Sequence, residues 1–136
     1  MKMRVIYFSK KKKMVDLAEY LSKNSDEYKP DRIPPDYSLD REKLLVLGMS
    51  SLLKLPDDVR RFCSNLKPGT VKNVALYTDR PEKEAAEFIA KLRESGANVI
   101  DDVLFVQSSF LPFSGASDEE KKQADEWFER ILPRLK

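Results

Sequence analysis

Two kinds of segment alternate along the chain, and this alternation limits the possible folds more than any other feature of the sequence. Short apolar runs of β-branched, aromatic and leucine residues cover 4–8, 43–48 and 71–77, and a less regular run covers 99–106, where Asp101-Asp102 interrupts it. Continuous apolarity over so few residues predicts strands that are covered on both faces. The polar stretch between Asn24 and Pro34 leaves room for a further strand near 28–33.

Four other segments share the spacing i, i+3, i+4, i+7, which places one apolar stripe on an otherwise charged helix. The stripes are Met14, Leu17, Ala18 and Leu21; Val59, Phe62, Cys63 and Leu66; Ala85, Phe88, Ile89 and Leu92; and Ala124, Trp127, Phe128 and Ile131. The boundary residues agree, because Ser117-Asp118-Glu119-Glu120 is a capping box and Gly96 stands where the third helix would stop. Trp127 and Cys63 are predicted to be core residues rather than ligands.

Strands that alternate with helices predict an α/β protein with parallel strands, right-handed crossovers and helices on both faces of the sheet. The segment 34–38 is too short for a full helix. The order is therefore either β-α-β-β-α-β-α-β-α or five β-α units with a degenerate second crossover. A chain of 136 residues seldom divides into two cores, so we expect residues 1–136 to form one domain.

The composition excludes several kinds of site. The chain contains no His, one Cys and four Gly. Imidazole ligands, histidine catalysis, an internal disulfide and a cysteine metal cluster are therefore excluded, and we expect no metal site. The glycines at 48, 69, 96 and 115 lie too far apart for the glycine-rich loops that bind nucleotides.

Charge and apolar run length predict the compartment. The 25 basic and 23 acidic residues give a net charge of +2. The longest apolar stretch, 44–53, is much shorter than the ~20 residues that span a bilayer. The run 5–8 is too short for the core of a signal peptide. Together with the lone Cys63, these features predict a cytoplasmic protein that does not enter a membrane.

In a parallel α/β sheet, ligands bind at the loops that follow the carboxyl ends of the strands. These loops are predicted at 9–14, 49–55, 78–80 and 107–117. The first contains Lys10-Lys11-Lys12-Lys13 directly before a helix, where backbone N–H groups and the helix dipole already favour an anion. Either the lysines bind a phosphate or an acidic partner there, or they point into water, where salt screens their repulsion.

The order and spacing of these segments resemble a small flavodoxin over almost the whole chain. Residues 4–8 resemble the first strand of that family, and 9–14 align with its phosphate loop, Ser-x-Thr-Gly-Asn-Thr. Residues 45–56 resemble the strand and loop that precede a helix begun by proline, and 71–77, 84–100 and 119–132 resemble the remaining elements. The resemblance implies a flavodoxin-like three-layer α/β/α sandwich with strand order 2-1-3-4-5.

The resemblance also implies an FMN site on these loops. Its candidate residues are Ser9, Lys10, Lys11, Lys12, Lys13, Met14, Met49, Ser50, Ser51, Leu52, Thr78, Asp79 and Phe110, with Phe113 as an alternative to Phe110. Lys11, Lys12, Lys13 and Met14 replace the family's Thr, Gly, Asn and Thr, so phosphate would meet lysine charges instead of a glycine-shaped cradle. Leu52 stands where the family has an aromatic residue that stacks on the flavin.

Two functional hypotheses follow. The first is an FMN-dependent electron carrier in which the flavin supplies the chemistry and docks with a redox partner, as the resemblance implies. The second is a flavin-free module that binds a small anionic ligand or an acidic protein partner through Lys10–Lys13. Nucleic-acid binding has only the lysine run in its favour, because no aromatic residues are interleaved with it.

Overall fold

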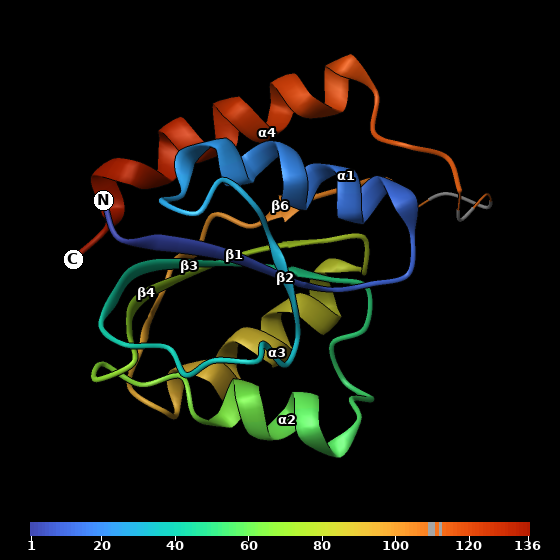
Figure 1. Ribbon diagram of the computed structural model, residues 1–136. Coiled ribbons are helices and arrows are strands. Elements are labelled where there is room, and N and C mark those ends of the chain that lie inside the picture. Colours follow the sequence, from blue (N-terminus) through green and yellow to red (C-terminus); the bar gives the residue numbers. More distant parts are fainter. Residues whose placement is uncertain (109–110, 112) are drawn as a thin grey trace.

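The structure, a computed structural model, describes residues 1–108, 111 and 113–136 (Figure 1). Within this part of the chain, six strands form one parallel sheet in the order β2-β1-β3-β4-β5, and β6 pairs with β4 as well. The strands are β1 (Met3–Phe8), β2 (Asp31–Arg32), β3 (Glu42–Met49), β4 (Val71–Thr78), β5 (Asn98–Val99) and β6 (Leu104–Phe105). The predicted parallel sheet and its 2-1-3-4-5 order are confirmed.

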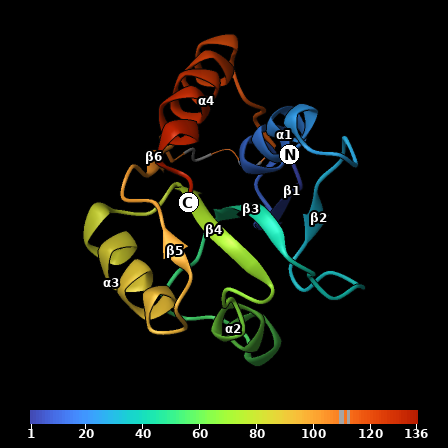
Figure 2. The same ribbon diagram turned by 90° about the vertical axis from the view of Figure 1, so that its left-hand side faces the viewer.

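Helices cover both faces of the sheet (Figures 1 and 2). The elements are α1 (Lys12–Leu21) and α4 (Asp118–Ile131) on one face, α2 (Asp57–Ser64) and α3 (Glu82–Arg93) on the other, and two short 3-10 helices, η1 (Ser22–Asn24) and η2 (Leu132–Arg134). Each face has its own apolar core. The observed order is β-α-β-β-α-β-α-β-β-α, because the last apolar run forms two short strands, β5 and β6. No helix lies between β2 and β3, so both predicted orders describe the start of the chain equally well.

The predicted apolar stripes are the sides of the helices that face the sheet. All four stripes are buried except at Phe62, which is half-buried. Trp127 is fully buried and its indole N–H donates to the carbonyl of Asp102 at 2.7 Å, and Cys63 is buried beneath α2. Ser117 forms the predicted capping box with Glu120, and Gly96 adopts a φ of +94°, as a helix stop requires.

The second crossover is the place where the sheet departs from a regular α/β pattern. The predicted strand near 28–33 consists of only two residues, and residues 33–41 form no helix before β3 begins. In place of a helix, Ile33 and Leu39 pack on the core below the sheet, and Tyr37 stacks on the guanidinium of Arg4 at 4.2 Å. The loop 33–41 contributes only a few apolar side chains to the core, so most of its residues can be polar.

One buried side chain connects three elements near the middle of the sheet. Tyr77 on β4 lies beside Gly48 on β3, and its hydroxyl donates to the carbonyl of Met14 in α1 at 2.9 Å. Burial raises the pKa of this phenol, so the hydroxyl keeps its proton. A Cβ added at Gly48 would lie 2.2 Å from the Tyr77 ring, so position 48 requires glycine because the ring occupies that space.

We predict that Gly48→Ala destabilises the fold by about 2 kcal/mol, because the new methyl group overlaps a ring that cannot move within a packed core. Urea denaturation followed by circular dichroism measures this change. Gly69→Ala is the matched control, because a Cβ there meets nothing within 4 Å. In a Tyr77→Leu background the penalty of Gly48→Ala should become small; an equal penalty in both backgrounds contradicts the explanation.

Candidate functional site

The four predicted loops meet at the carboxyl edge of the sheet, on the right-hand side of Figure 1. The hydroxyl groups of Ser9, after β1, and Ser50, after β3, lie 2.7 Å apart. The ammonium group of Lys11 reaches Asp79, after β4, at 2.7 Å and the Ser108 hydroxyl, after β6, at 3.5 Å. The structure therefore brings together side chains from all four loops, as the strand topology predicts.

The Lys11–Asp79 ion pair joins a partly exposed cation to a buried carboxylate. The side chain of Asp79 is 2% exposed and that of Lys11 is 31% exposed. Asp79 Oδ1 has no hydrogen-bond partner within the described residues. A carboxylate buried in this way depends on its single cation, because removal of that cation leaves an uncompensated charge.

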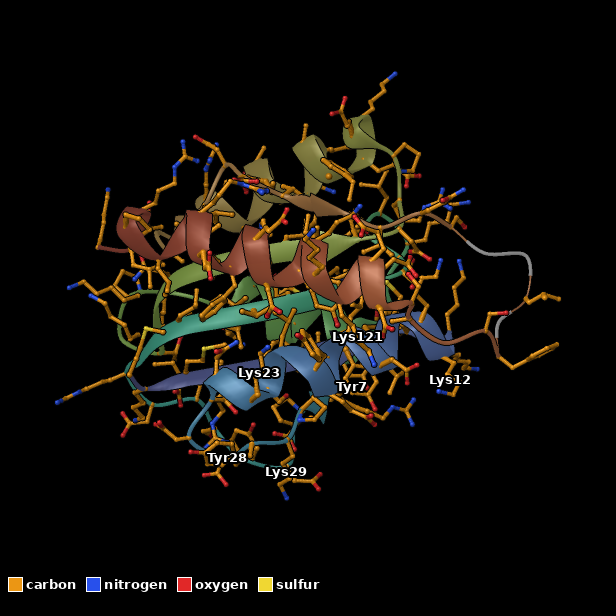
Figure 3. The ribbon with its side chains drawn as sticks, turned by 90° about the horizontal axis from the view of Figure 1, so that it is seen from above. Tyr7, Lys12, Lys23, Tyr28, Lys29 and Lys121 are labelled. Carbon is orange, nitrogen blue, oxygen red and sulfur yellow. The ribbon has the colours of Figure 1, made fainter. Side chains whose placement is uncertain are left out.

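Lys12 lies on the outer side of α1 and pairs with a carboxylate one turn further along the helix. Its ammonium group lies 2.9 Å and 3.0 Å from the two oxygens of Asp16. The same carboxylate accepts the backbone N–H of Ala116 at 3.1 Å. A Cβ at Gly115 would lie 2.4 Å from Asp16, so the last loop packs closely on this pair. Figure 3 shows Lys12 at the end of α1.

Lys13 connects α1 to α4. Its ammonium group lies 2.9 Å from Glu120 Oε2 and donates to the carbonyl of Gln107 at 3.1 Å. Burial acts to raise the pKa of the Glu120 carboxyl, but hydrogen bonds from Ser117 and Lys13 outweigh it, so the pKa lies below its usual value. Glu120 thus stays ionised and serves both the helix cap and the lysine.

The lysine segment is therefore neutralised mostly within the protein. Three of its four cations pair with carboxylates, whereas Lys10 is exposed and makes no ion pair with any residue that the structure describes. Lys12 is exposed as well, so the predicted water-facing arrangement applies to Lys10 and in part to Lys12, while Lys11 and Lys13 point to carboxylates of the protein itself. Residues 12–14 also belong to α1 rather than to the predicted loop.

The other predicted site residues divide between the core and the edge. Met14, Met49 and Leu52 are buried in the two apolar cores, at 0%, 0% and 3% exposure. Thr78 is also buried, where its hydroxyl donates to the Met49 carbonyl at 2.7 Å. Ser51 is half-buried and donates to the carbonyl of Lys54 at 3.0 Å.

Phe110 and Phe113 are the two aromatic residues that could cover a ligand at this edge. Phe110 lies outside the described residues, and Phe113 is 71% exposed. Between the loop after β3 and the start of α3, a shallow hollow of about 350 Å³ remains at this edge. Its lining is Ser50, Ser51, Leu52, Leu53, Lys54, Arg80 and Glu84. No aromatic side chain is among its described lining residues.

Two solved structures that align with this chain are flavodoxins. The Streptococcus pneumoniae TIGR4 flavodoxin, described as a novel drug target, aligns with a TM-score of 0.61 and 14% identity over 99% of this chain and 100% of its own. A short-chain flavodoxin associated with a non-canonical PDU bacterial microcompartment aligns with a TM-score of 0.60 and 13% identity over the whole of both chains. This chain therefore has the flavodoxin fold.

Sequence comparison adds nothing further: neither a protein-family model nor a curated protein matches the chain. Two absences hold for the described ranges 1–108, 111 and 113–136. In them, no three His, Cys, Asp or Glu residues are grouped so that they could hold a metal ion. In the same ranges, no helix combines the length and apolarity needed to cross a membrane.

Sequence reasoning included Asp79 among the candidate site residues but missed three other partners of the lysines: Asp16, Glu120 and Ser108. Asp16 follows Lys12 by four positions, so helical spacing alone could have identified that pair. Glu120 was recognised as a capping residue but not as a partner of Lys13. Ser108 carries no local signal, because only the packing of the last loop brings it to Lys11.

We predict that Lys11→Met destabilises the protein by about 2 kcal/mol, less than the ~3–5 kcal/mol of a fully buried pair because Lys11 is partly exposed. The double variant Lys11→Met/Asp79→Asn should recover most of this loss, since it removes the orphaned charge. Lys12→Met, which breaks an exposed pair on one helix, should cost less than about 0.5 kcal/mol. Urea denaturation of the four proteins tests this order; equal effects at Lys11 and Lys12 contradict it.

We also predict that Glu120→Gln lowers stability by less than about 1 kcal/mol at pH 7 and by nothing near pH 2. A lowered native pKa stabilises the fold above the unfolded-state pKa of ~4.3, and this contribution disappears as pH falls through the native value. Glutamine keeps the capping hydrogen bond, so the variant isolates the charge. Thermal unfolding of both proteins from pH 7 to pH 2 measures the difference; a constant difference rejects the assignment.

Proposed function

We propose that this flavodoxin-fold protein works without FMN, as an interaction module whose carboxyl edge binds an acidic protein surface. The observation that carries the proposal is the Lys11–Asp79 ion pair. In flavodoxins the corresponding loop holds the FMN phosphate through hydroxyl and backbone N–H groups. Here the loop's own lysine is engaged by a buried carboxylate, so the protein supplies the anion itself.

The described residues fit FMN poorly at each point of contact. The Ser9 hydroxyl accepts the backbone N–H of Lys11 at 3.0 Å and pairs with Ser50, so it is already engaged. Lys12 occupies the glycine position, within the first turn of α1. A phosphate that approached Lys11 would also meet the charge of Asp79, which repels it.

The loop after β3, where the family stacks an aromatic residue on the flavin, is equally unfavourable for a flavin ring. Leu52 stands at the stacking position, but its side chain is only 3% exposed and packs in the core. It lines the shallow hollow at this edge but offers a ring little surface there, and it has no π-face on which a flavin could stack. The hollow beside it has an ion pair at its rim, because the Arg80 guanidinium binds Glu84 through two contacts of 2.6 and 3.0 Å.

The exposed groups of the same edge support an acidic protein as the partner. Lys10 is exposed, and two large apolar side chains, Phe105 and Phe113, are 40% and 71% exposed. Exposed aromatic groups at the same edge of a sheet as an exposed cation are typical of protein-binding surfaces, because the rings supply buried area and the cation selects an acidic surface. A small anion would use the lysine and leave both rings in water.

We predict that FMN neither binds nor is retained. The protein should purify without colour, and FMN fluorescence should stay unquenched when the protein is added in large excess. The same titration with riboflavin separates recognition of the ring from recognition of the phosphate. Saturable quenching by FMN overturns the flavin-free assignment and restores the electron-carrier hypothesis.

We further predict that the carboxyl edge binds a random copolymer of glutamate and tyrosine, used as an acidic and aromatic probe, and does not bind polylysine. Amide shifts in NMR spectra should concentrate at 9–13, 105–108 and 113–117 and should weaken with added salt. Lys10→Glu/Phe113→Ser should reduce affinity about tenfold. The matched control, Lys29→Glu/Tyr28→Ser, changes an exposed lysine and a 75% exposed ring elsewhere and should have no effect. Shifts spread over other surfaces contradict the proposal.

A further inference from the structure

A second hollow, of about 250 Å³, lies between α2, α3 and the loop that follows β3. Figure 2 shows these two helices on the face of the sheet opposite α1 and α4. Its lining residues are Leu52, Leu53, Lys54, Leu55, Arg60, Cys63, Ser64, Phe88, Lys91 and Leu92. The two helices contribute side chains from their facing sides. None of the residues that carry the proposed carboxyl-edge interaction belongs to this set.

The floor of the hollow is apolar. Leu52, Cys63, Phe88 and Leu92 are each between 2% and 6% exposed. Burial raises the pKa of the Cys63 thiol to about 12, so at neutral pH it is protonated and behaves as a small apolar group. At the mouth, Leu53 is 39% exposed, which continues the apolar surface toward solvent. The floor therefore suits a hydrocarbon chain rather than a polar ligand.

The rim of the hollow is cationic. Lys54, Arg60 and Lys91 surround it, and no acidic residue is among its described lining. Arg60 pairs with Asp57 at 2.7 Å, whereas Lys54 and Lys91 are exposed and form no ion pair with the described residues. Two unpaired ammonium groups beside an apolar floor are complementary to a ligand with an anionic head and an apolar tail.

We propose that this hollow binds a small amphiphilic carboxylate. Its volume lies below the ~300–1,000 Å³ of sites for drug-sized ligands, so it suits a single unbranched chain of medium length. The tail would cover Phe88 and Leu92, and the carboxylate would remain at the surface between Lys54 and Lys91. The head group need not lose all its water there, because lysine ammonium groups reach it from flexible stems.

Titration of the full chain with sodium octanoate, followed by NMR, tests this proposal. Amides at 52–55, 60–64 and 88–92 should shift saturably. The double variant Lys54→Gln/Lys91→Gln should bind octanoate about fivefold more weakly. The control Lys29→Gln/Lys122→Gln, which removes the same charge from exposed positions that do not line the hollow, should bind it unchanged. 1-Octanol should shift the same amides with no dependence on either variant.

Three results would overturn the proposal: no saturable shift, shifts centred on the lysine segment 10–13, or equal affinities of the two double variants. All four substituted lysines are exposed, so we expect both double variants to fold like the wild type. The dispersion of amide signals in their NMR spectra verifies that they are folded. The outcome is independent of the FMN and copolymer titrations, because those report on the carboxyl edge of the sheet.

Discussion

The hydrogen bond from Tyr77 to the carbonyl of Met14 is the interaction on which the arrangement of the carboxyl edge depends. It crosses from β4 to α1, and the ring that makes it occupies the space that Gly48 leaves open on β3. Because both groups are buried, water does not compete for this bond. The contact fixes the first turn of α1 relative to two strands, and the lysine segment immediately precedes Met14. The directions of Lys11 and Lys13 follow from that anchor.

Four adjacent lysines at the start of a helix repel one another and oppose the helix dipole, so the fold must neutralise them or leave them in water. The protein neutralises three, each with a carboxylate from a different element: Asp79 after β4, Asp16 within α1 and Glu120 at the start of α4. Two of the pairs join the start of α1 to other parts of the structure, namely the loop after β4 and the start of α4. The third lies within α1, and its carboxylate, Asp16, also binds the backbone of the last loop at Ala116. The three ion pairs thus hold the start of α1 in place, while Lys10 stays exposed.

The spacing of apolar residues along the chain predicted the elements whose burial depends on residues close together in the sequence. Helical stripes and apolar runs identified all four helices and the central strands, because burial imposes its period directly on the sequence. The strand predicted near 28–33 exists, but β2 has only two residues, since register with β1 rather than apolar residues sets its pairing. The ion pairs Lys11–Asp79 and Lys13–Glu120 join residues far apart in the sequence, and their geometry depends on tertiary packing. Charge alone could not choose between a bound anion, water and an internal carboxylate.

Flavodoxin geometry and flavodoxin chemistry are separable in this fold, because the backbone order is retained while the loop side chains decide what can bind. An incoming phosphate would have to displace Asp79 from Lys11 and leave a buried carboxylate with both oxygens unpaired beside a new negative charge. That penalty opposes the favourable contact with the lysine. Leu52 contributes to both hollows: it lines the shallow hollow at the carboxyl edge and forms part of the floor between α2 and α3. Whether a ring could stack at the carboxyl edge and whether an apolar chain could lie between the two helices therefore both depend on this one side chain.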